Sequence, residues 1–224
     1  MRITIDGQTI DIAPDTTILE AAEQLGIHIP RLCYHPHLTA NALCRLCVVE
    51  WEGARTLVPA CVARVREGAV IHTNSERVRR ARRTILELLY SAVDLSEAPE
   101  LAAYAEELGV DPERFAGGER REFPVFDDNA FYVRDYNKCV LCWRCVQACA
   151  DDLQFTYALT LSGRGFHTRV DTFFHAPMPE TTCVFCGNCV AVCPTDALEA
   201  KVEFLVEEGV PVREAIWQRR RGGG

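Results

Sequence analysis

The sequence predicts an α+β fold in which two cysteine-bearing regions flank a helical stretch, and three observations support this prediction. The N-terminal region alternates apolar and polar residues over 2–5 and 8–12, around an Asp-Gly pair, as β-hairpins do. The middle of the chain shows the apolar period of a helix. The twelve cysteines of the 224-residue chain fall into three groups of four. Two of these groups, within 139–149 and 183–193, share one spacing and form an internal repeat.

Residues 1–73 are predicted to form one small domain. Asp15 or Thr16 is placed to cap a helix whose apolar residues lie within 18–25, and Gly26 is placed to end that helix. A loop that carries cysteines follows, and further strands come after it. This order of hairpin, helix, cysteine loop and strands indicates a β-grasp ferredoxin. The later strands are expected at 48–51, 56–58 and 69–72.

Residues 74–130 are predicted to be a helical linker. Asn74 or Ser75 caps a helix with apolar residues on one side, and Leu101–Leu108 forms a shorter helix that ends at Gly109. Arginines crowd the remaining faces of the first helix. Two interpretations of them stay open, a solvated helix surface or a docking face for an acidic partner subunit. These residues are Arg77, Arg79, Arg80, Arg82 and Arg83.

Residues 131–205 are predicted to form a domain of the two-cluster ferredoxin type, because the cysteine repeat lies within them. Between the two copies, Phe155–Leu161 and Phe166–Val170 flank a Ser-Gly-Arg-Gly turn, which predicts an inserted hairpin. The tail 206–224 is set apart, and its last residues, Arg219–Gly224, are expected to be frayed.

The repeated spacing C-x2-C-x2-C-x3-C predicts two [4Fe–4S] clusters. Iron in a sulfide core takes soft thiolate ligands, and a short loop can wrap one cubane with three of them. The fourth cysteine of each run bonds the other cluster, so each cluster draws on both copies of the repeat. A zinc site would use two C-x2-C pairs per ion and leave cysteines over. Cluster A is assigned Cys139, Cys142, Cys145 and Cys193, and cluster B is assigned Cys183, Cys186, Cys189 and Cys149.

The first cysteine group has the spacing C-x10-C-x2-C-x13-C. Plant-type [2Fe–2S] sites have C-x4-C-x2-C with a distant fourth cysteine, so the first gap is longer here. The surrounding order of strand, helix and loop favours a two-iron site over zinc. His35 and His37 lie near this group, but a packing role is favoured for them because four cysteines are already available. The predicted [2Fe–2S] ligands are Cys33, Cys44, Cys47 and Cys61.

Segments around these cysteines resemble the complex I 75-kDa-subunit family, which includes the α subunit of NAD-linked formate dehydrogenases, iron-only hydrogenases and the small diaphorase subunit of NAD-reducing nickel–iron hydrogenases. Val133–Cys139 resembles that family's entry into its cubane domain. The resemblance spans residues 1–205, and 158–160, 162–166 and 193–195 are most similar to the formate dehydrogenase branch. The N-terminal segments that resemble the family are Leu32–Tyr34, Cys44–Cys47 and Pro59–Cys61.

Two departures from the family pattern lead to further expectations. Family members usually bind another cubane, through one histidine and three cysteines, between the two domains. Tyr90–Pro99 contains neither residue type, so that cluster is predicted to be absent. A large catalytic domain follows the cubane domain in formate dehydrogenases and iron-only hydrogenases. It is missing from this sequence, so the active site is expected on another polypeptide.

The sequence therefore predicts one [2Fe–2S] and two [4Fe–4S] clusters in a subunit of a multi-subunit oxidoreductase. This subunit would relay electrons between a flavin/NAD(P)H diaphorase module and a separate catalytic subunit that contains molybdenum or tungsten, or nickel and iron. The alternative is a free, soluble, multi-cluster ferredoxin-like carrier. Formate, hydrogen or another compound stays open as the terminal substrate, and no catalytic residue is assigned.

Other function classes are disfavoured. A net charge of −8 argues against nucleic acid as a partner. The sequence has no Gly-rich nucleotide loop and no P-loop, so NAD, flavin and ATP are not expected on this chain. It has no long apolar run and no signal-peptide core, which predicts a cytoplasmic chain without a transmembrane segment. Trp143, within the cluster A loop, either shields the cubane from water or simply packs, and Gly187 is expected to relieve crowding near cluster B.

Overall fold

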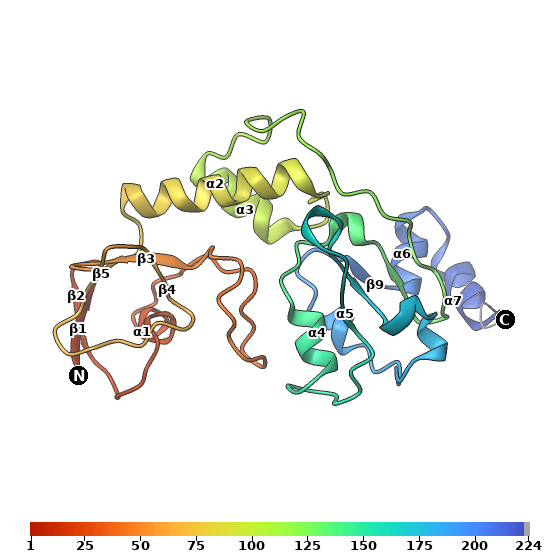
Figure 1. The fold of residues 1–224 in the computed structure, drawn as a ribbon, viewed down its shortest axis with the longest axis horizontal. Coiled ribbons are helices and arrows are strands. Elements are labelled where there is room, and N and C mark those ends of the chain that lie inside the picture. Colours follow the sequence, from red (N-terminus) through yellow and green to blue (C-terminus); the bar gives the residue numbers. More distant parts are fainter. Residues whose placement is uncertain (222–224) are drawn as a thin grey trace. The chain divides into compact units, whose positions relative to one another are not determined.

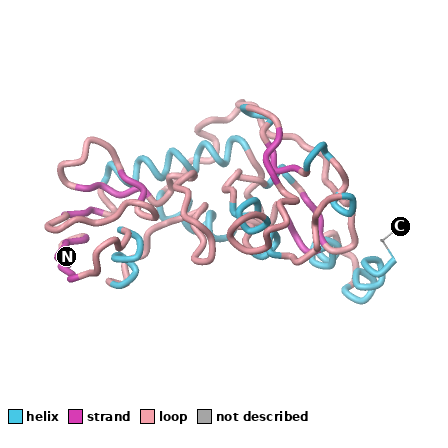
Figure 2. The backbone as a smooth tube through the Cα atoms, turned by 60° about the horizontal axis from the view of Figure 1, so that its bottom comes forward, coloured by secondary structure: helices cyan, strands magenta, loops and turns pink. Residues whose placement is uncertain are grey.

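The computed structural model describes residues 1–221, and the chain divides into two compact units (Figure 1). Unit 1 comprises Met1–Tyr34, Ala40–Ser91 and Glu100–Ala116. Unit 2 comprises His35–Thr39, Ala92–Pro99 and the residues from Gly117 onward. Both units contain helices and short strands joined by long loops (Figure 2), which confirms the predicted α+β class.

A mixed sheet is the framework of unit 1, with strand order β2-β1-β5-β3-β4. Strand β1 (Arg2–Ile5) pairs antiparallel with β2 (Gln8–Asp11), which confirms the predicted hairpin. It also pairs parallel with β5 (Val70–His72). Strand β3 (Val48–Trp51) pairs antiparallel with both β5 and β4 (Val58–Pro59). The alternate residues that face inward form the hydrophobic core of the unit.

Helix α1 (Ile18–Gln24) contributes its buried apolar residues to that core. Its N-cap is Thr17, so the predicted caps Asp15 and Thr16 are wrong. The reason is a capping box with Glu20, in which each residue satisfies a backbone N–H of the other. Glu20 N donates to Thr17 Oγ1 at 3.2 Å, and Thr17 N donates to Glu20 Oε2 at 2.7 Å.

Two longer helices follow the sheet, α2 (Glu76–Ala92) and α3 (Pro99–Leu108). The arginines of α2 divide, since Arg77 and Arg80 are exposed whereas Arg82 and Arg83 turn inward, and neither interpretation anticipated this division. Arg82 is buried, and Arg83 donates to the Leu108 carbonyl at 2.8 Å, at the end of α3. The solvated-surface interpretation is therefore wrong for Arg82, whose guanidinium forms hydrogen bonds within unit 1.

Unit 2 is built from two strand pairs and short helices. Strand β6 (Tyr132–Arg134) pairs antiparallel with β9 (Leu198–Ala200), and β7 (Thr160–Ser162) pairs antiparallel with β8 (Arg169–Asp171). Tyr136 and Met178 are fully buried in its core among cysteines of both repeats. The helices are α4 (Arg144–Cys149), α5 (Asn188–Ala191), α6 (Lys201–Glu207) and α7 (Val212–Arg221), and 3₁₀ turns occur at Tyr136–Lys138, Gly165–His167, Phe173–His175 and Met178–Glu180.

The inserted hairpin is shorter than the sequence predicts. Only β7 and β8 pair, so the predicted strands Phe155–Leu161 and Phe166–Val170 are both wrong over their first residues, and 165–167 form a 3₁₀ turn instead. Phe155 and Tyr157 have φ values of 58° and 54°, in the left-handed region, which excludes a strand there. The backbone N–H groups of residues 155–157 instead donate to the carbonyls of Cys149 and Ala150, at the end of α4. These bonds satisfy carbonyls that a helix end leaves without intrahelical partners.

The C-terminal part is more ordered than predicted. Arg219–Arg221 lie in helix α7, so the prediction of a frayed end is wrong for them. Gly222–Gly224 lie outside the described residues. Across residues 1–221, the structure has no helix with both the length and the apolar content needed to span a membrane.

Candidate metal centres

The four cysteines of the first group converge within unit 1. Cys33 N donates to Cys44 Sγ and Cys44 N donates to Cys33 Sγ, each at 3.4 Å. A hydrogen bond from the Cys33 thiol lowers the pKa of Cys44 to about 6, and a bond from Cys61 lowers the pKa of Cys47. A hydrogen bond with Cys47 and burial raise the pKa of Cys61, and the charges of Cys47, Cys33 and Cys44 add to the shift, so the four sulfurs lie within one electrostatic environment.

Arg82 fixes the loop that presents two of these cysteines. Its Nε donates to the Leu46 carbonyl at 3.0 Å, and its Nη2 donates to the Val48 carbonyl at 2.8 Å, on either side of Cys47. Burial lowers the pKa of Arg82 to about 10, so the side chain is still charged at neutral pH. Leu46 N donates to Cys44 Sγ at 3.4 Å, and such N–H donors stabilise a thiolate.

The cysteines assigned to cluster A also lie together, although Cys193 is 48 positions or more from the others in sequence. Burial raises the pKa of Cys139 to about 11 and that of Cys142 to about 12, and the charge of Cys193 adds to both shifts. Burial also raises the pKa of Cys145 strongly, with further contributions from Cys142, Cys139 and Cys193. A cation that the four sulfurs share would offset this cost of burying thiolates.

The cysteines assigned to cluster B line a single, almost wholly apolar cavity. Burial raises the pKa of Cys189 to about 12, and the charges of Cys149, Cys183 and Cys186 contribute to that shift. Cys186 is the exposed member of the set. Each of the three groups consists of four cysteines, whose soft thiolates are a donor set that suits iron–sulfur clusters.

The loops around the clusters rely on left-handed backbone at matching positions. Leu141 and Phe185 both have a φ of 52°, and Leu141 N and Phe185 N donate to the sulfurs of Cys139 at 3.4 Å and Cys183 at 3.3 Å. Two positions further on, Trp143 has a φ of 73° where Gly187 has 80°. The φ of 80° lies in the left-handed region that favours glycine, and a Cβ added at Gly187 would meet no protein atom within 4 Å. Relief of crowding near the sulfides of cluster B stays a prediction.

The histidines contact groups other than the cysteine sulfurs. His28 bonds the Tyr104 hydroxyl at 3.0 Å, His72 bonds Glu52 at 2.9 Å and His175 bonds Asp171 at 2.6 Å. His37 N donates to His35 Nδ1 at 3.3 Å, and burial lowers the pKa of His35. These contacts agree with a packing role for the histidines.

One acidic cluster was missed by sequence reasoning. The carboxylates of Glu97, Glu199 and Glu207 lie within 4.8 Å of one another. The Lys138 ammonium bonds Glu97 and lies 4.0 Å from Glu199, so it supplies positive charge to the group. Burial raises the pKa of Glu199 to about 7. Glu97 lies far in sequence from Glu199 and Glu207, which belong to the adjacent elements β9 and α6, so no local spacing indicated the whole group.

Comparisons with known proteins agree with this geometry. The family model of a 2Fe-2S iron-sulfur cluster binding domain matches residues 1–76, and that of a 4Fe-4S dicluster domain matches residues 138–197. A solved NAD+-reducing [NiFe]-hydrogenase contains a chain with a TM-score of 0.80 and 29% identity, and the match covers 89% of this chain and 87% of that one. These matches confirm the resemblance of the chain to the complex I 75-kDa-subunit-like family.

The chain spans only part of the length of the curated relatives that it matches. NADP-reducing hydrogenase subunit HndD of Solidesulfovibrio fructosivorans is 42% identical over 88% of the chain, which corresponds to 36% of the relative. NADPH-Fe(3+) oxidoreductase subunit alpha of Geobacter sulfurreducens is 36% identical over 90% of the chain and 24% of its own length. An NADH-quinone oxidoreductase chain of Rhizobium meliloti is 34% identical, with 88% and 24% covered. The similarity to the formate dehydrogenase branch stays a prediction, because none of these relatives has that name.

Proposed function

We propose that this chain relays electrons between an NAD(P)H/flavin module and a separate catalytic subunit of a multi-subunit oxidoreductase. It would do so with one [2Fe–2S] and two [4Fe–4S] clusters. The [2Fe–2S] ligands are Cys33, Cys44, Cys47 and Cys61; cluster A takes Cys139, Cys142, Cys145 and Cys193, and cluster B takes Cys183, Cys186, Cys189 and Cys149.

The observation that carries the proposal is the cavity lined by Cys149 together with Cys183, Cys186 and Cys189. Cys149 belongs to the first repeat and the other three belong to the second, so the exchange of the fourth ligand predicted from the spacing is also the arrangement that the fold favours. Two independent zinc sites of the C-x2-C type would instead keep each repeat to itself.

Iron–sulfur clusters supply reversible one-electron chemistry when bound. The chain's own residues hold and isolate them. Backbone N–H groups of Leu46, Leu141 and Phe185 point at cysteine sulfurs and stabilise their negative charge. The mostly buried cysteines keep water from the sites, and exclusion of water affects the reduction potential.

The proposed partners follow from the relatives. A diaphorase-type NAD(P)H/flavin subunit would give or take electrons at one end, because the named relatives are NAD(P)-linked. A nickel–iron, molybdenum or tungsten subunit would do so at the other end. The proposed location is the cytoplasm. We also propose that Tyr90–Pro99 binds no cluster, since that segment offers neither cysteine nor histidine.

Anaerobic purification of the chain from native-like expression tests the proposal. We expect about ten irons per chain and electron paramagnetic resonance (EPR) signals of one [2Fe–2S] and two [4Fe–4S] clusters. Co-purification with a flavin-binding and a metal-binding subunit is expected in gel filtration. Colourless, zinc-loaded protein would refute the cluster assignment. An iron content of about fourteen per chain, the count expected with a third cubane, would refute the proposal that Tyr90–Pro99 binds no cluster. Elution of the chain alone would favour the free carrier.

A further inference from the structure

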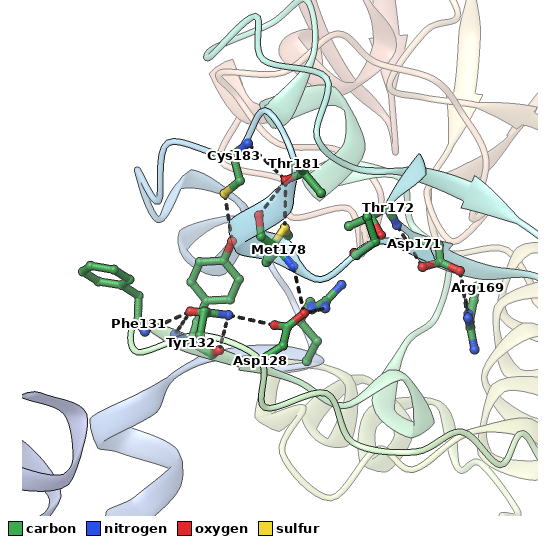
Figure 3. Close-up of polar contacts among 12 residues, drawn as sticks. Asp128, Phe131, Tyr132, Arg169, Asp171, Thr172, Met178, Thr181 and Cys183 are labelled. Carbon is green, nitrogen blue, oxygen red and sulfur yellow. Dashed lines mark hydrogen bonds and ion pairs between the residues drawn. The ribbon is translucent and has the colours of Figure 1, made fainter. Parts of the chain in front are cut away.

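Tyr132 places a hydroxyl group on a predicted cluster B ligand. Its Oη lies 3.1 Å from Cys183 Sγ (Figure 3), within hydrogen-bonding distance for sulfur. The residue is 2% exposed, so water does not compete for this contact. Tyr132 also lines the cavity that the four cluster B cysteines share.

The backbone holds Tyr132 in position from several sides. It is the first residue of β6 and lies opposite Ala200 of β9. Asn129 brackets it, since Asn129 Oδ1 accepts from Tyr132 N at 3.1 Å and Asn129 Nδ2 donates to the Tyr132 carbonyl at 3.0 Å. The Phe185 ring lies 6.1 Å from the Tyr132 ring. Little rotational freedom is left to move the hydroxyl off the sulfur.

Cys183 is held just as firmly. Cys183 N donates to Thr181 Oγ1 at 3.1 Å, and Thr181 Oγ1 donates to the Met178 carbonyl at 2.8 Å (Figure 3). Phe185 N donates to Cys183 Sγ at 3.3 Å. The sulfur therefore has two donors, one from the backbone and one from Tyr132.

The equivalent sulfur of the first repeat has a different environment. Leu141 N donates to Cys139 Sγ at 3.4 Å, as Phe185 N does to Cys183. Tyr136 is the buried tyrosine near cluster A, but within the described part of the chain no hydrogen bond joins its hydroxyl to a cysteine sulfur. The side-chain donor thus distinguishes Cys183 from Cys139.

We infer that Tyr132 is a positioning residue whose hydroxyl donates to the Cys183 thiolate and raises the reduction potential of cluster B. Reduction adds an electron whose charge spreads onto the ligand sulfurs, and a hydrogen bond to a more negative sulfur is stronger. The direction of donation is fixed, because a metal-bound thiolate has no proton to give. A phenol carries its proton at neutral pH, so Tyr132 can act as the donor. This inference rests on the cluster assignment proposed above.

The test is an EPR-monitored redox titration of anaerobic wild type, Tyr132→Phe and Tyr136→Phe. In Y132F, one [4Fe–4S] signal should shift to a more negative potential. A tenfold change in the ratio of reduced to oxidised cluster would be about 59 mV for a one-electron couple. The other cubane and the [2Fe–2S] signal should stay in place, and Y136F should leave the cluster B potential unchanged. Cys183→Ser identifies the cluster B signal.

A Y132F protein with full iron content and unchanged potentials would overturn the inference and leave the relay proposal intact. Wild-type protein without [4Fe–4S] signals would instead refute the relay proposal itself. If Y132F loses the iron of cluster B, the hydrogen bond can still be tested in the wild-type protein. Electron–nuclear double resonance in H2O and D2O should show one exchangeable proton coupled to cluster B in addition to those of the Phe185 and Ala158 N–H groups and the Thr156 hydroxyl, and the absence of this further proton would overturn the inference.

Discussion

The two cysteine repeats of unit 2 have the same spacing and the same left-handed backbone positions, yet their surroundings differ. Cys142 of the first repeat is buried, whereas its counterpart Cys186 is exposed. Trp143 occupies the left-handed position that Gly187 has in the second repeat. The spacing therefore determines how the loop folds around a cluster, and the rest of the unit determines the environment of each cluster.

The difference continues at the sulfurs. In the cluster B set, the Tyr132 hydroxyl lies 3.1 Å from Cys183 Sγ and the Thr156 hydroxyl lies 3.3 Å from Cys149 Sγ. In the cluster A set, Thr195 Oγ1 lies 4.0 Å from Cys193 Sγ, at the limit of a hydrogen bond. Two sites that are alike in ligand number and spacing are thus expected to differ in potential.

The fourth cysteine of each repeat is predicted to bind the cluster of the other repeat. Removal of this cysteine should have the largest effect of the substitutions considered. Cys149→Ala should remove cluster B, although Cys149 lies in the first repeat, and Cys193→Ala should remove cluster A. Each variant is expected to lose about four irons. Iron analysis and EPR check this. If C149A removes the same signal as Cys142→Ala, each repeat binds its own cluster and the assignment is wrong.

Asp128 ties the strand before the first repeat to the segment before the second. Its Oδ2 accepts from Arg134 at 2.5 Å and from Met178 N at 2.9 Å (Figure 3). Asp128→Ala leaves the buried Arg134 charge without its partner, which should cost about 3 kcal/mol. The loss of unfolding free energy is measured by urea denaturation, monitored by circular dichroism. Asp127→Ala is the control, with a cost below about 1 kcal/mol because Asp127 is half exposed. Equal costs would contradict this role of Asp128.

Substitutions of Gly187 test whether the left-handed backbone at this position, which both repeats share, lowers the free energy of unfolding when the residue has a side chain. Gly187→Ala should destabilise by about 1 kcal/mol, because an L-residue with a side chain is strained at a φ of 80°. Gly187→Asn should cost less, since asparagine tolerates this region. The midpoint of urea unfolding gives both values. If Gly187→Ala and Gly187→Asn destabilise the protein equally, backbone strain is not the cause of the destabilisation. Trp143, at the matching position of the first repeat, would then not be strained either.

Thr156 should give the smallest effect. Thr156→Val removes the hydroxyl 3.3 Å from Cys149 Sγ, and we expect a negative shift of the cluster B potential smaller than in Y132F. The bond is longer, and the same hydroxyl also lies 3.4 Å from the Cys149 carbonyl. Thr195→Val is the matched control and should leave cluster A unchanged. A shift in T195V as large as that in T156V would remove the proposed difference between the sites.

The sequence predicted much of the fold because the relevant signals are local. The hairpin of β1 and β2, the strands β3 and β5 and the helix α3 lie close to where alternation, periodicity and capping residues indicated them. Competition between neighbouring residues limited this accuracy. Thr17 became the N-cap because Glu20 completes its capping box, and residues 155–157 left the predicted strand to bond the end of α4.

The sequence by itself predicts the number and type of ligands, since soft thiolates at C-x2-C spacing admit few other uses. The tertiary structure decided what surrounds them. Tyr132 and Cys183 are 51 positions apart, and Arg82 reaches the Leu46 carbonyl from 36 positions away. Local spacing carries no information on such contacts, because they form only when separate elements pack together and exclude water from the groups between them.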